Sequence, residues 1–460
     1  MKKKLLFTAT VAALALTLAS CSGSTAPTGE TTSNAPGPEA LENADGVTKI
    51  TVWHGLGGVN GEAFQAAVDA FNADNEGEIE VEATYQGRYA DLLAKYTAAL
   101  RTDSAPTVML AGDIATGYMI DVGRSIPASD MAAANPDDVN FDDLLPLAAN
   151  YYNVDDVQWA VPMNTSTPML WVNRDILTQA GISDTSDLTT LDGVVDAAET
   201  IQDATGQIGL TMPDDDWYIE QLVATSGELF CSPDNGRSGK AATSININNG
   251  EAADAITKVA DLYRSGVAVA GAPDGSAATS AFMAGQVGMT FYSSGLLGDL
   301  DEANLPFEYE ALPFPISGPE DESGVVIGGA ALWLSNTAED AAQVAGWKLV
   351  DYLTSADTQE TFSQATGYIP INTKTLDSDT EKAYLDSNPN VQAFIDQITT
   401  VPEKTQTAGC VTGAMTGIRS AVIDQLQAAY AGSITVDEAL DTAVKNAQTA
   451  IDQYNEQTAG

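Results

Sequence analysis

Strand-like and helix-like patterns alternate along the first third of the chain. Short β-branched or alternating runs, typical of strands, occupy residues 49–54, 79–85 and 105–112. Between them, residues 60–75 and 92–100 place apolar side chains at the three- and four-residue spacing of a helix face. The order strand, helix, strand, helix, strand predicts a parallel sheet with crossover helices.

The alternation resumes after residue 165. Further strand-like runs occupy residues 168–173, 286–292, 307–315 and 326–335. Helical periods occupy residues 192–200, 252–263, 341–354, 390–400 and one long amphipathic segment at 417–454. This pattern predicts two α/β lobes, each a sheet flanked by helices. A ligand is then expected in the crevice between the lobes, beyond the carboxyl ends of the strands.

The stretch VPMNTSTPMLWVNRD at residues 161–175 is expected to carry the chain between the lobes. Pro162 and Pro168 fix their own φ angles and hold the preceding residues extended, which suits a hinge strand. We therefore expect an N-lobe from residues 47–164 plus 306–335. The C-lobe is expected from residues 165–305 plus 336–460.

The N-terminus has the pattern of a secretory signal. Three lysines precede an apolar stretch too short to span a bilayer as a mature helix, so residues 1–20 are expected to be removed. The sequence Leu-Ala-Ser-Cys ending at Cys21 is similar to a bacterial lipobox, which implies a lipid-anchored protein on the outer face of the cytoplasmic membrane. An ordinary secretory signal is the alternative. Residues 21–46 are rich in Ser, Thr, Pro, Gly and acid, which indicates a flexible tether.

The charge of the chain is strongly negative. The formal net charge is −45, and removal of the first twenty residues with their three lysines would bring it to −48. Such a charge opposes binding to nucleic acid or to an anionic membrane through an exposed surface. In an oxidising compartment, Cys231 and Cys410 are expected to form a disulfide within one lobe, with two free buried thiols as the alternative.

Signals for catalysis or metal binding are weak. The chain has one histidine, His54, beside Trp53, and a packed role is expected for it. There is no G-x-S-x-G turn and no zinc motif. The acidic run at 72–80 resembles a calcium loop, but Ala83 stands where the bidentate glutamate would be, so a turn between helix and strand is expected. Asp214–Asp216 are expected in a solvated loop. We expect no cofactor, no metal and no enzymatic activity, although 64 acidic residues leave a glycosidase-like carboxylate pair as an alternative. A structural or adhesive lipoprotein is a further alternative.

Several motifs occur in a familiar order. They are ITVWHGL, YQGRY, APTVMLAGD, the 161–175 stretch, AFMAGQVGMTFYSSG, VIGGAALWL and TGYIPI. From about Lys49 to Leu440 the chain resembles the family 1 extracellular solute-binding proteins of carbohydrate-type ABC importers. Within that family it is most similar to the binders of glycerol-3-phosphate and glycerophosphodiesters. The resemblance implies a two-lobed periplasmic-binding-protein fold of type II.

The resemblance also implies ligand-binding residues, because each lies at a matching motif position. They are Tyr89, Asp113, Ser166, Trp217, Ser293, Gly329, Tyr368 and Arg419. Arg419 would supply a permanently charged fork suited to phosphate, the serines would donate hydrogen bonds, and Gly329 would offer its backbone. Asp113 stands where the family usually has glutamate, one methylene longer.

The function implied is that of a monomeric substrate-binding lipoprotein. It would capture glycerol-3-phosphate or a glycerophosphodiester and deliver it to the membrane permease subunits of an ABC importer. A neutral sugar or oligosaccharide in the same cleft is the alternative ligand, since related sugar binders share these strands.

Overall fold

The computed structural model describes residues 35–458. The expected signal peptide, Cys21 and residues 22–34 of the expected tether lie outside this part of the chain. Within the described part, residues 39–42 form helix α1 (Glu39–Glu42), which packs against α13 (Asp340–Thr354). The expectation of a flexible tether as far as residue 46 is therefore wrong for this segment.

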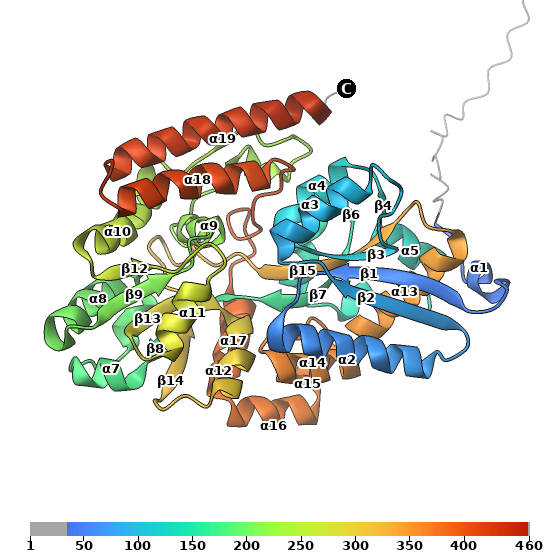
Figure 1. The fold of residues 1–460 in the computed structure, drawn as a ribbon, viewed down its shortest axis with the longest axis horizontal. Helices are drawn as coiled ribbons and strands as arrows, with labels where there is room; N and C mark the ends of the chain where they lie inside the picture. The colour runs from blue at the N-terminus through green and yellow to red at the C-terminus, as the bar shows by residue number, and fades with distance from the viewer. Residues whose placement is uncertain (1–34, 459–460) are drawn as a thin grey trace, which may run out of the picture. The chain divides into compact units, whose positions relative to one another are not determined.

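A first sheet of six strands lies within residues 35–458 (Figure 1). From one edge its order is β2 (Ile79–Tyr85), β1 (Thr48–His54), β3 (Val108–Gly112), β15 (Gly328–Ser335) and β4 (Ser125–Ile126), with β7 (Val161–Ser166) also paired to β15. The first three strands run parallel, as predicted, and helices α2 (Gly58–Asp74) and α3 (Tyr89–Ala99) make the crossovers. β15 runs antiparallel to its three partners, so the sheet is mixed.

The second sheet of the described residues repeats this plan. Its order is β12 (Ala268–Ala270), β9 (Ile208–Met212), β13 (Val287–Ser293), β8 (Pro168–Asn173) and β14 (Tyr309–Pro313). β12, β9 and β13 are parallel, whereas β8 is antiparallel to β13 and β14. Two sheets of similar topology support the predicted pair of lobes. The prediction of a purely parallel sheet is wrong, because both sheets contain antiparallel pairs. A hydrophobic run identifies a strand but does not encode its direction.

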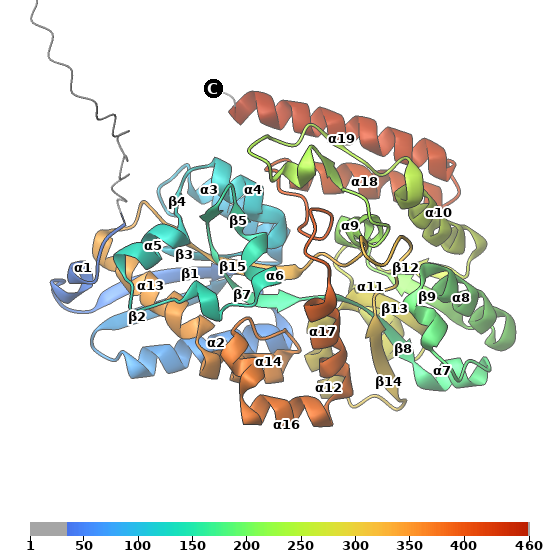
Figure 2. The ribbon, with the colours of Figure 1, turned by 180° about the vertical axis from the view of Figure 1, so that it is seen from behind.

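Strands β7 and β8 connect the two sheets. Only Thr167 separates them, and every residue of both strands is buried. Pro162 lies within β7 and Pro168 begins β8, so the predicted crossing segment is confirmed. A second crossing runs from β14 in the second sheet to β15 in the first (Figure 2).

Helices cover both sheets. Those packed with the first sheet or its neighbours are α4 (Thr116–Asp121), α5 (Ala128–Ala134), α6 (Pro146–Tyr151), α13, α14 (Ala356–Thr366) and α15 (Thr373–Asp377). Those associated with the second sheet are α7 (Arg174–Gln179), α8 (Leu191–Thr205), α9 (Asp216–Ala224), α10 (Gly250–Ser265), α11 (Ser276–Met283), α17 (Pro389–Thr400), α18 (Met415–Tyr430) and α19 (Val436–Thr458). Between them lie α12 (Leu297–Ala303) and α16 (Asp379–Ser387). The predicted single segment at 417–454 is two helices, α18 and α19, which lie side by side.

The chain divides between the sheets differently from the expected boundaries. β14 lies inside the range expected for the N-lobe but pairs with β8 of the second sheet. α13 lies inside the range expected for the C-lobe but packs on β1, β7 and β15 of the first sheet. The sequence pattern predicts which face of a segment is apolar and buried, but it does not predict which sheet that face packs against.

Two hydrophobic cores lie within residues 35–458. One contains Val52, Phe64, Leu110 and Trp333 beside the first sheet, and the other contains side chains of α8, α10 and α18 beside the second. Cys231 and Cys410 form a disulfide, and both belong to the second core. No helix in this part of the chain combines the length and apolar character needed to cross a membrane.

Candidate functional site

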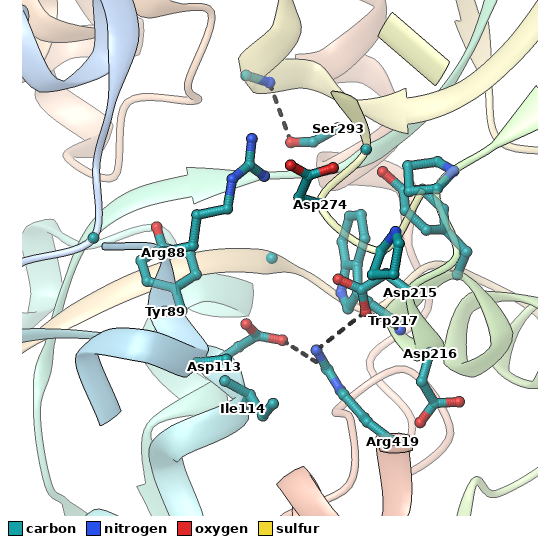
Figure 3. Close-up of a pocket in the computed structure, with 18 of the residues that line it drawn as sticks. Arg88, Tyr89, Asp113, Ile114, Asp215, Asp216, Trp217, Asp274, Ser293 and Arg419 are labelled. Carbon is teal, nitrogen blue, oxygen red and sulfur yellow. Dashed lines mark hydrogen bonds and ion pairs between the residues drawn. The ribbon is translucent and has the colours of Figure 1, made fainter. Parts of the chain in front are cut away.

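A cavity of about 1020 Å³ lies between elements of the two sheets. This volume is at the upper end of the range for small-molecule sites, about 300–1000 Å³. Its lining includes all eight residues that the sequence resemblance selects, namely Tyr89, Asp113, Ser166, Trp217, Ser293, Gly329, Tyr368 and Arg419. Residues separated by more than 300 positions in the chain therefore meet around one hollow (Figure 3).

Tyr89 and Tyr368 bring phenol groups to the same wall. Tyr89 begins α3, and its ring lies where a Cβ on Gly112 would come within 2.6 Å, so a glycine at the end of β3 makes room for it. The Tyr89 hydroxyl accepts a hydrogen bond from Asn164 Nδ2 at 3.1 Å. Gly367, at a φ of 76°, caps α14 and turns the chain into Tyr368. Burial raises the pKa of Tyr368 to about 12, so its hydroxyl keeps its proton at neutral pH.

The crossing strands supply Ser166 and Gly329. Ser166 ends β7 and is 3% exposed, and β15 pairs with β7 so that Gly329 lies opposite Thr165. Gly329 has a φ of 113°, and a Cβ there would lie 1.9 Å from the Asn164 carbonyl oxygen. Only glycine allows the backbone of β15 to approach β7 this closely.

Trp217 and Ser293 stand on elements of the second sheet. Trp217 lies in the first turn of α9, where the N-cap Asp215 accepts a hydrogen bond from its backbone N–H at 2.9 Å. The indole Nε1–H is buried and has no hydrogen-bond partner in the structure. Ser293 ends β13, and its Oγ accepts a hydrogen bond from the Gly295 backbone N–H at 3.2 Å. An aromatic side chain and a serine therefore line the cavity from this side.

Arg419 is surrounded by carboxylates. Its guanidinium lies 3.3 Å from Asp113, 3.6 Å from Asp215 and 3.7 Å from Glu220, and its side chain is only 13% exposed. Asp216 is also close enough to act on its charge. The arginine is therefore already paired, within the protein, with carboxylates from two segments, one at Asp113 and the other at α9 with its N-cap residue. Figure 3 shows it beside Asp113 and Asp215.

The carboxylates of this group have perturbed pKa values. Burial raises the pKa of Asp113, Asp216 and Glu220, and the charge of Arg419 opposes that rise in each case. Burial alone would lower the pKa of Arg419, but the four carboxylates hold it above its ordinary value. Arg419 therefore stays charged and limits the rise in the pKa values of these acids.

The interpretation of Asp214–Asp216 as a solvated loop is wrong. Asp214 and Asp216 are 8% and 1% exposed, and all three line the cavity. Neither carboxylate oxygen of Asp216 has a hydrogen-bond partner. Three consecutive acids are predicted to be solvent-exposed, because burying unpaired carboxylates is costly. The arginine that compensates their burial lies 203 residues or more away in the chain, so the sequence gives no local sign of it.

His54 is packed, as predicted. It is 4% exposed, its ring lies 4.8 Å from the ring of Phe64, and burial lowers its pKa to about 4. Within residues 35–458, no three His, Cys, Asp or Glu side chains are grouped as metal ligands would be. The carboxylates around Arg419 share its guanidinium as their cationic partner.

Sequence reasoning missed Arg88, Tyr218 and Tyr292, all of which line the cavity. Arg88 is the N-cap residue of α3, directly before Tyr89. Arg88 lies inside the YQGRY motif, and the chain has only 19 lysines and arginines. These two facts together could have marked it as a binding residue. Tyr218 and Tyr292 sit next to two selected residues, Trp217 and Ser293, and carried no distinguishing pattern.

Comparison with known proteins places this architecture in context. A family model for bacterial extracellular solute-binding proteins matches residues 66–393. The sn-glycerol-3-phosphate-binding periplasmic protein UgpB of Escherichia coli K12 is 27% identical over 423 residues, covering 91% of this chain and 96% of that protein.

Solved structures show the same fold. UgpB from Mycobacterium tuberculosis, in complex with glycerophosphocholine, has a TM-score of 0.72 at 19% identity, covering 88% of this chain and 98% of that one. The GacH receptor of Streptomyces glaucescens, studied with acarbose, has a TM-score of 0.73 at 20% identity, covering 89% of this chain and 99% of its own. The predicted two-lobed periplasmic-binding-protein fold is thus confirmed. Because the family model spans well over half of its length, the chain belongs to the bacterial extracellular solute-binding proteins.

Proposed function

We propose that this protein is the substrate-binding lipoprotein of an ABC importer and that it captures glycerol-3-phosphate or a glycerophosphodiester. The observation that carries the proposal is the convergence of eight residues, selected by motif position alone, around one cavity. The similarity to E. coli UgpB along 91% of the chain supports the same ligand class.

The donors around the cavity suit such a solute. Hydroxyls of Ser166, Ser293, Tyr89 and Tyr368 can each donate to phosphate oxygens or exchange hydrogen bonds with glycerol. The Asp113 carboxylate can accept from two neighbouring hydroxyls at once. The cavity exceeds the needs of glycerol-3-phosphate alone, which leaves room for the substituent of a diester.

Delivery requires anchoring and closure. Cys21 would carry lipid and hold the protein at the extracytoplasmic face of the membrane, and two or more acyl chains anchor stably where one does not. The two crossing connections, β7–β8 and β14–β15, would act as the hinge about which the lobes close on the solute. The closed form would then dock on the permease subunits.

A neutral sugar is the second candidate, and the charge of the cavity favours it. Eight aspartates and two arginines line the cavity, so the site carries no excess of positive charge. Carboxylates paired with aromatic side chains such as Trp217 are well suited to sugar hydroxyls and sugar faces. The same volume accommodates a short oligosaccharide.

A thermal-shift screen separates the two candidates. We expect sn-glycerol-3-phosphate or glycerophosphocholine to raise the melting temperature of the purified protein in a saturable manner. A ligand that binds only the folded state stabilises it by about 2.7 kcal/mol at a hundred times its Kd, which is a readily measured shift.

Inorganic phosphate and glycerol serve as controls in that screen, because each carries only part of the proposed ligand. A shift with maltose and none with the two phosphate esters would replace the leading candidate by the sugar. A flat response to every compound would count against a solute-binding role for this cleft.

A further inference from the structure

The two arginines of the cavity differ in their availability to a ligand. Arg419 is buried against carboxylates at 3.3, 3.6 and 3.7 Å. Arg88 is exposed to the cavity, and among residues 35–458 no carboxylate lies within the 4.0 Å of an ion pair with it. An incoming anion therefore finds one guanidinium already paired with carboxylates and the other hydrogen-bonded to the phenol of Tyr292 but without a carboxylate partner.

Several hydroxyl groups line the cavity together with Arg88. The charge of Arg88 lowers the pKa values of the Tyr218, Tyr292 and Tyr368 phenols, and Arg88 also forms a side-chain hydrogen bond with Tyr292. Figure 3 shows the Arg88 side chain reaching from the backbone beside Tyr89 toward Asp274 and Ser293. Asp274 and Asp299 also act on its charge, but both remain beyond ion-pair distance. Arg88 thus shares a cavity wall with hydroxyl donors, which is a suitable setting for an anionic oxygen.

We propose that Arg88 holds the anionic group of the ligand, with Ser293 and Tyr292 as donors, while Arg419 and its carboxylates hold hydroxyl groups. This inference rests on the proposed capture of a phosphate ester and assigns its orientation in the cleft. It also transfers to Arg88 the phosphate contact that the sequence resemblance implies for Arg419.

Charge decides between the two ends of the cavity. A phosphate beside Arg419 would also lie close to Asp113, Asp215, Asp216 and Glu220, and repulsion from four carboxylates outweighs attraction to one guanidinium. The same carboxylates are good acceptors for sugar or glycerol hydroxyls. Near Arg88 the carboxylates that act on its charge are Asp274 and Asp299, neither of which forms an ion pair with it, and Asp91 in the same helix also lines the cavity. Arg88 is exposed, so solvent screens these charges more than those around the buried Arg419.

Isothermal titration of the Arg88→Gln variant tests the orientation. Loss of a charge-assisted contact is expected to weaken binding of sn-glycerol-3-phosphate by about 10- to 100-fold. Arg88→Lys keeps the charge but not the fork, so an intermediate affinity is expected. Arg101→Gln, an exposed arginine outside the cavity, is the matched control and should bind like the unchanged protein.

The possible outcomes separate this inference from the proposed function. Unchanged glycerol-3-phosphate affinity in Arg88→Gln, with tight binding by the parent protein, overturns the role of Arg88 and leaves the function in place. Equal weakening for glycerol-3-phosphate and for an uncharged ligand such as maltose also overturns it, because that result indicates a general disturbance of the cleft. A parent protein that binds no phosphate ester rejects the proposed function and this inference together.

Discussion

Replacing Arg419 by glutamine is expected to destabilise the ligand-free protein by about 3–5 kcal/mol at neutral pH, the usual cost of removing one partner from a buried ion pair. The guanidinium is 13% exposed, and its partners Asp113 and Glu220 have side chains that are 8% and 2% exposed. Without it, several carboxylates would remain charged in a poorly hydrated site.

The loss should depend on pH in a defined direction. Burial raises the pKa of Asp113, Asp216 and Glu220, and Arg419 is the group that opposes the rise. In the variant these pKa values rise further above those of the unfolded chain, which are near 4. Acids with raised pKa values stabilise the fold fully below about pH 4 and lose that contribution as the pH rises through their folded values. The deficit of the variant should therefore be largest at neutral pH and shrink on acidification.

Urea denaturation at several pH values measures this effect. Arg264→Gln is the control, because Arg264 pairs with Asp261 on an exposed helix face, with its side chain 40% exposed, and should cost less than about 1 kcal/mol. A variant at position 419 as stable as the parent at neutral pH would show that the buried carboxylates do not depend on this arginine.

Replacing Gly329 by alanine is expected to cost about 3 kcal/mol or more in the free energy of unfolding. The residue has a φ of 113°, which strains any side-chain-bearing residue, and the new Cβ would lie 1.9 Å from the Asn164 carbonyl oxygen. β15 and β7 would have to separate, and that movement displaces Ser166, the last residue of β7, from the cavity wall. We therefore expect loss of ligand binding as well as stability.

Gly181→Ala provides the matched control for that substitution. Gly181 also has a positive φ, of 83°, but nothing lies within 4 Å of the position of a new Cβ. Only conformational strain remains there, so about 1 kcal/mol is expected. Equal effects of the two substitutions would contradict the close approach of β15 to β7.

The sequence predicted the positions of helices and strands better than it predicted which of them pack or pair together. The runs at 79–85 and 390–400 correspond to β2 and α17 within one residue, because their apolar spacing is unambiguous. The predicted lobe assignments of β14 and α13 were wrong, because the sequence identifies a buried face but not the surface that covers it. The break between α18 and α19 was missed although Gly432 lies inside it.

The candidate site was predictable where a motif carried it and not where contact over long sequence separations created it. Tyr89, Ser166 and Tyr368 follow from short motifs and line the cavity. The pairing of Arg419 with Asp113 joins residues 306 positions apart, and no local pattern encodes it. Arg88 stands inside the YQGRY motif, but only the folded structure shows that it lines the cavity without a carboxylate partner.

A crystal structure of the protein with the phosphate ester that gives the strongest thermal shift would decide whether this cleft holds the solute. We expect the ligand between the two sheets, in contact with Tyr89, Ser166, Ser293 and Tyr368, with its phosphate toward Arg88. A ligand bound outside this cavity, in a complex with the cleft left empty, would contradict the proposed binding site.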